Sequence, residues 1–175
     1  MAYPTVSAPY GLKPVNLIGG QVFAGATTKN YPIQYGYATD IFYGDMVSLT
    51  RGSVTKNVDT TDSVGNGLVG VFLGVSYTNP TTKQKQFAQY WPAGTAAGDA
   101  QAIVCDDPDT VFKAVVCSSG TTVASGAIPL VGTNLSMINT AGSTATGNSS
   151  NAVLAPTATP VTSILPVRCV GVVPD

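Results

Sequence analysis

The chain has 175 residues, of which 44% are hydrophobic and 10% are charged, against about 25% charged in an average globular domain. Disorder requires low hydrophobicity together with a high net charge, and the sequence has neither. A transmembrane helix requires about 18 or more consecutive apolar residues, and the sequence has no such run. We therefore expect an ordered protein without a membrane partner. The net charge of −1 and the scattered Lys and Arg residues argue against a nucleic-acid partner, because binding phosphates requires a basic patch.

The residue types predict an all-β fold. Val, Thr, Ser, Ala, Gly and Pro dominate the sequence, and glutamate, a strong helix former, is absent. Gly and Pro divide the chain into short runs, which is typical of a short-stranded β-barrel or β-sandwich. We expect an extended N-terminal arm over residues 1–28 and a β-rich body over 29–175, with possible lobes at 29–117 and 118–175.

The first 28 residues predict an arm because their apolar residues sit beside Pro or Gly, which favours extended backbone. We expect Tyr3, Pro4, Tyr10 and Leu12 to contact a neighbouring subunit or another partner. The alternative is an irregular segment that lies over its own domain. The start of the chain has no basic segment followed by a long apolar one, so we expect no secretory signal.

The segment from Asn30 to Pro92 has the clearest strand patterns. The strand-like runs on either side of Arg51-Gly52 predict a β-hairpin. The nearly continuous apolar run at residues 67–78 predicts a strand that is buried on both faces. In the last predicted strand, Phe87, Gln89 and Trp91 would share one face. The predicted strands are residues 31–37, 45–50, 53–58, 67–78 and 85–91.

The remainder of the chain is richer in Ser, Thr, Gly and Asn. Two predicted strands, 99–105 and 110–116, are joined by the acidic turn at 106–109, as a hairpin or a corner. Residues 139–151 predict a flexible loop. Residues 164–173 predict a strand. Their Val-Gly-Val pattern is shared with residues 69–71, either because the two strands are related, one in each lobe, or by chance.

The sequence favours a protein that is not an enzyme and needs no cofactor. Histidine is absent, which removes the usual general base and the commonest transition-metal ligand. The acidic run Asp106, Asp107 and Asp109 could bind calcium, but it lacks the spacing of a calcium loop and is better explained as a turn, so we expect no metal site. Three widely spaced cysteines predict free thiols rather than a disulfide framework.

Aromatic residues at 87–91 are the other candidate site. Phe87, Tyr90 and Trp91 could form a platform for a sugar or base, but aromatic residues more often serve as core or interface anchors. We therefore place Tyr90 and Trp91 among the expected interface residues.

Several strand and turn segments carry the most distinctive sequence of the chain. They are residues 10–16 (YGLKPVN), 36–39 (GYAT), 41–45 (IFYGD), 69–78 (VGVFLGVSYT), 87–92 (FAQYWP), 106–109 (DDPD) and 167–171 (VRCVG). Together they resemble virion structural proteins of marine and freshwater tailed phages, specifically capsid decoration (cement) proteins.

The resemblance implies a β-barrel or β-sandwich subunit on the capsid exterior, made in the host cytoplasm. Its implied partners are the major capsid protein and further copies of itself, with a homotrimer preferred over a dimer. It implies no catalytic residues. The alternative is a head-fibre or host-attachment module that binds glycans through exposed aromatic residues such as Tyr90 and Trp91.

Overall fold

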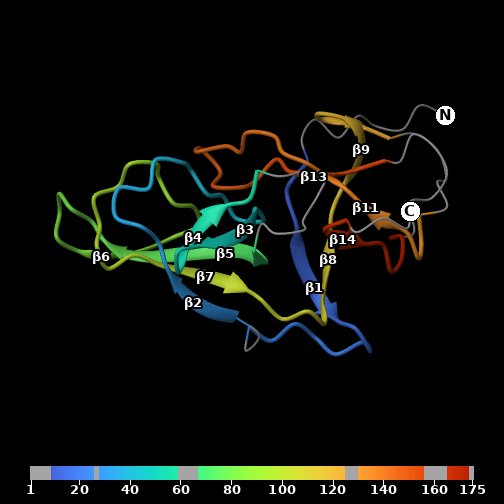
Figure 1. The fold of residues 1–175 in the computed structure, drawn as a ribbon, viewed down its shortest axis with the longest axis horizontal. Helices are drawn as coiled ribbons and strands as arrows, with labels where there is room; N and C mark the ends of the chain where they lie inside the picture. The colour runs from blue at the N-terminus through green and yellow to red at the C-terminus, as the bar shows by residue number, and fades with distance from the viewer. Residues whose placement is uncertain (1–8, 26–27, 59–66, 125–129, 156–164, 174–175) are drawn as a thin grey trace.

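The computed structural model describes residues 9–25, 28–58, 67–124, 130–155 and 165–173. These residues form an all-β fold without a helix, which confirms the predicted fold class, and their strands do not close into a barrel. The strands gather in two regions, a large sheet and a set of smaller sheets beside it (Figure 1). We call them the main sheet and the small-sheet region.

The main sheet contains six antiparallel strands from the first two thirds of the chain. The strand order is β2-β7-β5-β3-β4, and β6 pairs with the far end of β5. Their bounds are β2 (Thr28–Pro32), β3 (Met46–Thr50), β4 (Ser53–Lys56), β5 (Leu68–Thr78), β6 (Lys85–Ala88) and β7 (Gln101–Cys105).

The main sheet curls around its own hydrophobic core. Its two edge strands approach each other, and a parallel bridge joins Ile33, just after β2, to Val54 in β4. Apolar residues from the inner face and from the connecting loops fill the space between. This core contains Ile33, Ile41, Val47, Val54, Phe72, Val75, Tyr77, Trp91, Ala97, Ala100, Ala102 and Val104.

The predicted hairpin and the predicted buried strand are both observed. Arg51 and Gly52, with φ values of 52° and 82°, connect β3 to β4, and positive φ at both central residues matches the twist of a two-residue hairpin. β5 lies between β7 and β3. At Gly70 a Cβ atom would lie 2.0 Å from the Cys105 carbonyl oxygen, so only glycine allows the two strands to approach this closely.

The small-sheet region is assembled from both ends of the chain. Strand β1 pairs with β8, β11 pairs with β14, and a third sheet has the order β10-β9-β13-β12. Its strands are β1 (Lys13–Leu17), β8 (Thr110–Lys113), β9 (Val116–Ser119), β10 (Thr122–Val123), β11 (Asn134–Leu135), β12 (Met137–Ile138), β13 (Ala152–Leu154) and β14 (Val167–Arg168).

A second hydrophobic core joins the small-sheet region to the main sheet. It contains Leu12, Met46, Val71, Leu130, Leu135, Met137 and Val153. Met46 and Val71 belong to β3 and β5, so the main sheet contributes residues to both cores. After β7 the chain passes from the main sheet to the small-sheet region at residues 106–109. Strand β9 spans the expected boundary between lobes 29–117 and 118–175.

Several predicted elements differ from the structure. The strand expected at 31–37 ends at Pro32, because Tyr37 N–H bonds the Gln34 carbonyl in a turn and Gly36 has φ of 67°. The strand expected at 85–91 ends at Ala88. Within 165–173, strand pairing is confined to Val167–Arg168. The acidic turn is a corner, since β7 and β8 lie in different sheets.

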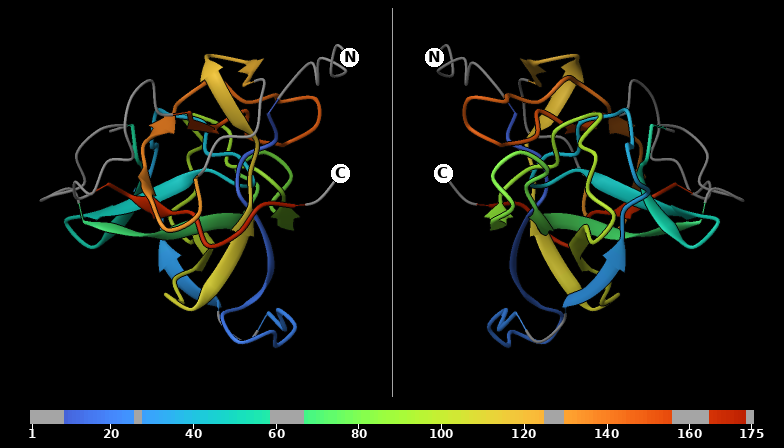
Figure 2. Two further views of the ribbon diagram at one scale, coloured as in Figure 1. Left: turned by 90° about the vertical axis from the view of Figure 1, so that its right-hand side faces the viewer. Right: turned by 90° about the vertical axis from the view of Figure 1, so that its left-hand side faces the viewer.

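The predicted N-terminal arm is part of the fold from Pro9 onward. The Gly11 and Leu12 N–H groups donate to the carbonyls of Asn151 and Gly44, and β1 pairs with β8. The alternative, a segment lying over its own domain, therefore describes residues 9–17. Beyond β1, residues 18–25 form a loop that projects from the rest of the protein (Figure 2).

The loop at 139–151, expected to be flexible, is held by hydrogen bonds along its length. Tyr43 N–H donates to the Gly147 carbonyl, and Ser149 N–H donates to the Tyr43 carbonyl. Ser149 and Asn151 are buried. The polar residues of this loop include members of a buried hydrogen-bonded site. Composition alone does not distinguish such residues from solvent-exposed ones.

Candidate interaction surface

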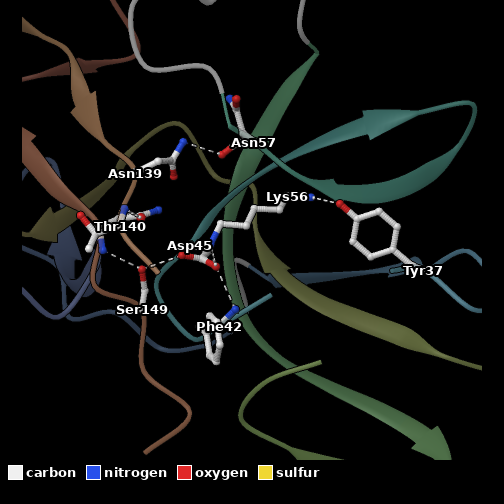
Figure 3. Close-up of polar contacts among 9 residues, drawn as sticks. Tyr37, Phe42, Asp45, Lys56, Asn57, Asn139, Thr140 and Ser149 are labelled. Carbon is white, nitrogen blue, oxygen red and sulfur yellow. Dashed lines mark hydrogen bonds and ion pairs between the residues drawn. The ribbon is translucent and has the colours of Figure 1, made fainter. Parts of the chain in front are cut away.

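A buried polar cluster fixes the junction between the main sheet and the loop at 139–151 (Figure 3). Asp45, immediately before β3, forms an ion pair with Lys56 Nζ at 3.0 Å. The same carboxylate accepts hydrogen bonds from the Phe42 N–H at 2.9 Å and from the Ser149 hydroxyl at 2.5 Å. Asp45 is inaccessible to solvent, so this cluster is structural.

Neighbouring contacts extend this junction. Asn139 donates to the Asn57 carbonyl at 3.2 Å (Figure 3). Asn151 accepts a hydrogen bond from Thr140 N–H. Most buried polar groups in native proteins are hydrogen-bonded, because an unpaired one destabilises the fold. No local sequence pattern indicates this cluster, because its members are spread from residue 42 to residue 151.

The acidic run at 106–109 forms a turn, the structure that the sequence favoured over a calcium site. Asp107 accepts a hydrogen bond from Asp109 N–H at 2.9 Å. Asp106 accepts from Lys29 and Tyr31, each at 2.8 Å. Partial burial acts to raise the pKa of the Asp106 carboxyl, but these hydrogen bonds hold it below its usual value. Within the described residues, no three acidic or cysteine side chains gather in a metal-binding group.

Asp99 is held in place from β5 and β6. Its carboxylate accepts hydrogen bonds from Thr78 N–H, from the Thr78 hydroxyl and from Lys85 Nζ. Hydrogen bonding by Thr78, followed by that of Lys85, keeps the pKa of Asp99 well below its usual value. Asp99 therefore ties the end of β5 to the loop that precedes β7.

Of the four predicted contact residues in the arm, Tyr3 and Pro4 lie outside the described residues. Leu12 is buried in the second core, so the prediction that it contacts a partner is wrong. Tyr10 is half-buried, and burial raises the pKa of its hydroxyl. Since Leu12 and β1 belong to the fold, removing the first 20 residues would damage the protein rather than release an arm.

The predicted aromatic contact at 90–91 is wrong for Trp91. Trp91 is fully buried in the first core, where its ring N–H donates to the Tyr37 carbonyl and its ring packs edge-on against Tyr77. Tyr90 is half-buried and stacks on Phe42 with ring centroids 5.5 Å apart. The chain bends after β6, so Trp91 turns into the core while Phe87 remains outside.

The exposed apolar side chains lie on several separate segments, including Tyr35 in the turn after β2 and Val58 after β4. Val15, Ile18 and Val22 belong to β1 and the loop that follows it. Phe87, on β6, is 80% exposed. A third group lies on the paired segments near β11 and β14, and we call it the C-terminal patch; it consists of Val131, Val170, Val172 and Val173.

Comparisons with protein-family models, curated proteins and solved structures find no match to the chain. Among the described residues, no helix has the length and apolar character needed to cross a membrane. The candidate interaction surface is therefore defined by the exposed apolar side chains of this chain alone.

Proposed function

We propose that the protein is a capsid decoration protein, a non-enzymatic subunit that binds the outer surface of a tailed-phage head. The observation that carries the proposal is the distribution of exposed apolar side chains over several separate segments, among them the 18–22 loop and the C-terminal patch. Grouped exposed apolar side chains, such as the four valines of the C-terminal patch, mark protein-protein contacts. The segment resemblance described above favours the virion as their setting.

Several contact segments on one subunit suit a protein that joins neighbouring capsid subunits. Each contact can be weak, because a subunit held at one point meets its second site at high effective concentration. With 10% charged residues, such contacts would depend on apolar burial and backbone hydrogen bonds more than on charge. The major capsid protein is the proposed partner.

The glycan-binding alternative loses the feature that motivated it. Trp91 lies in the core and Tyr90 is stacked on Phe42, so the two do not form an exposed platform. Phe87 and Tyr35 are exposed aromatic side chains, but they lie on separate segments.

The test is co-sedimentation of the full chain with mature head shells from which it has been stripped, and with unexpanded procapsids. We expect saturable binding to the expanded shells only, at a fixed whole-number ratio to the major capsid protein. Binding of a few copies per particle, or none, would contradict the proposal.

Two variants separate the contributing segments. Deleting residues 1–8 removes Tyr3 and Pro4 but no described residue. The double substitution Ile18→Ser and Val22→Ser removes the apolar side chains of the projecting loop. We expect the loop variant to bind expanded shells more weakly than the wild type does. Urea unfolding of each variant serves as the folding control.

A further inference from the structure

The outer edge of β6 differs from the other edges of the main sheet. At the edge formed by β2, Pro32 has no N–H to donate, a feature that discourages strand pairing. At the edge formed by β4, Val54 is bridged to Ile33, and Lys56 N–H donates to the Tyr37 hydroxyl. Within the described chain, β6 pairs with β5 and with no other strand.

The register of the β5–β6 hairpin shows which backbone groups of β6 are open. Asn79 N–H donates to the Gln84 carbonyl, so these two residues form a hydrogen-bonded pair at the turn. Hydrogen-bonded and non-hydrogen-bonded pairs alternate along antiparallel strands. Gln86 and Ala88 therefore direct their backbone groups toward Tyr77 and Val75. Lys85 and Phe87 direct theirs away from the sheet.

The side chains on this edge favour a protein partner. Phe87 lies opposite Ser76 and is 80% exposed. Lysine on an edge strand usually opposes pairing with another strand. Here Lys85 Nζ lies 3.0 Å from the Asp99 carboxylate, so its charge is already compensated.

We propose that β6 pairs with β6 of a second copy of this chain, in an antiparallel arrangement with Gln86 on the two-fold axis. This register places Lys85 opposite Phe87 of the second copy, so both outward-facing residues of each strand exchange backbone hydrogen bonds. A two-fold axis at Lys85 would set like charges opposite each other. An axis at Phe87 would need Gln89, which lies beyond the end of β6.

The same register covers the exposed aromatic ring. Phe87 and Phe87 of the second copy become diagonal neighbours on one face of the joined sheet, about 7–8 Å apart and within reach of aromatic side chains. The interface is self-complementary, as a two-fold dimer requires. Of the trimer and dimer considered from the sequence, this edge favours the dimer, and the inference does not depend on capsid binding.

The first test measures self-association of the purified full chain by sedimentation over a wide concentration range, without capsids. We expect a monomer-dimer equilibrium whose dissociation constant rises at least about tenfold in Phe87→Ser, which removes a central aromatic contact. Val22→Ser is the matched control, since Val22 is 79% exposed but lies on another segment. A wild-type protein that stays monomeric, or an assembly unaffected by Phe87→Ser, would overturn the proposal.

The second test checks the register by disulfide cross-linking in a Cys169→Ser background; Cys105 and Cys117 are buried. Residues that face each other across a non-hydrogen-bonded pair have Cα atoms about 4.5 Å apart, within disulfide range. Gln86→Cys should give a covalent dimer on mild oxidation, much faster than Lys85→Cys. Equal rates would contradict the proposed pairing. Capsid binding is measured separately, so the two proposals can fail independently.

Discussion

The main sheet and the small-sheet region use the same residue types but are stabilised differently. Strands of the main sheet extend to eleven residues in β5 and surround a core drawn mostly from that sheet and its own loops. Strands of the small-sheet region have two to five residues. Their core borrows Met46 and Val71 from the main sheet. The small-sheet region therefore depends on the main sheet for its packing.

Two Val-Gly-Val segments make the same comparison at single-residue scale. In the main sheet, Val71 is buried and Gly70 faces the Cys105 carbonyl. In the C-terminal patch, Val170 and Val172 are exposed, and a Cβ at Gly171 would meet no atom within 4 Å. The similarity between the two segments is thus not structural.

The largest expected effect is that of Gly70→Ala. The added Cβ would lie 2.0 Å from the Cys105 carbonyl oxygen, which forces β5 and β7 apart, and we expect a loss of more than about 4 kcal/mol in the free energy of unfolding. Gly171→Ala is the matched control and should change stability by less than about 0.5 kcal/mol. Urea unfolding measures the change in stability of each variant. Equal losses in the two variants would contradict the described difference in packing around Gly70 and Gly171.

The second prediction breaks the junction between the two regions. Asp45→Asn leaves Lys56 buried without its ion-pair partner, which costs about 3–5 kcal/mol in comparable buried pairs. The double variant Asp45→Asn/Lys56→Met removes both charges, so it should recover part of the lost stability. Thermal unfolding of the two variants and the wild type provides the comparison. A double variant no more stable than Asp45→Asn would argue against the ion pair as the cause.

The smallest effect concerns the exposed carboxylate of Asp99 at the far end of the main sheet. Its pKa is lower in the folded protein than its ordinary value of 3.8. The hydrogen bonds of Asp99 therefore stabilise the fold above that value, and the stabilisation is lost as the pH falls toward the folded pKa.

Asp99→Asn should consequently lower the urea midpoint slightly at pH 7, and the difference from the wild type should narrow at pH 3. Asp40→Asn is a control with another exposed contact, from Ala93 N–H to the Asp40 carboxylate. A gap that widens on acidification would contradict the assigned role of Asp99.

Local patterns predicted the parts of the main sheet whose structure depends on neighbouring residues. Arg51-Gly52 sets the β3–β4 hairpin because two residues with positive φ suffice to reverse the chain. The apolar run of β5 is long enough to indicate a central strand by itself. The predicted alternation of faces was wrong where a strand ended early, as at Ala88. One bend after this residue moves Trp91 from the face of Phe87 into the core.

The sequence by itself determined the all-β class, through its β-branched residues and frequent turn residues, and excluded histidine chemistry by composition. The tertiary structure decided the roles of Leu12, Trp91 and Ser149. Each depends on partners far away in the chain, such as Asp45 for Ser149, 104 residues apart. Local periodicity describes a residue and its neighbours, whereas burial depends on which distant segments meet. For the same reason, the open edge of β6 becomes visible only when every strand has been placed.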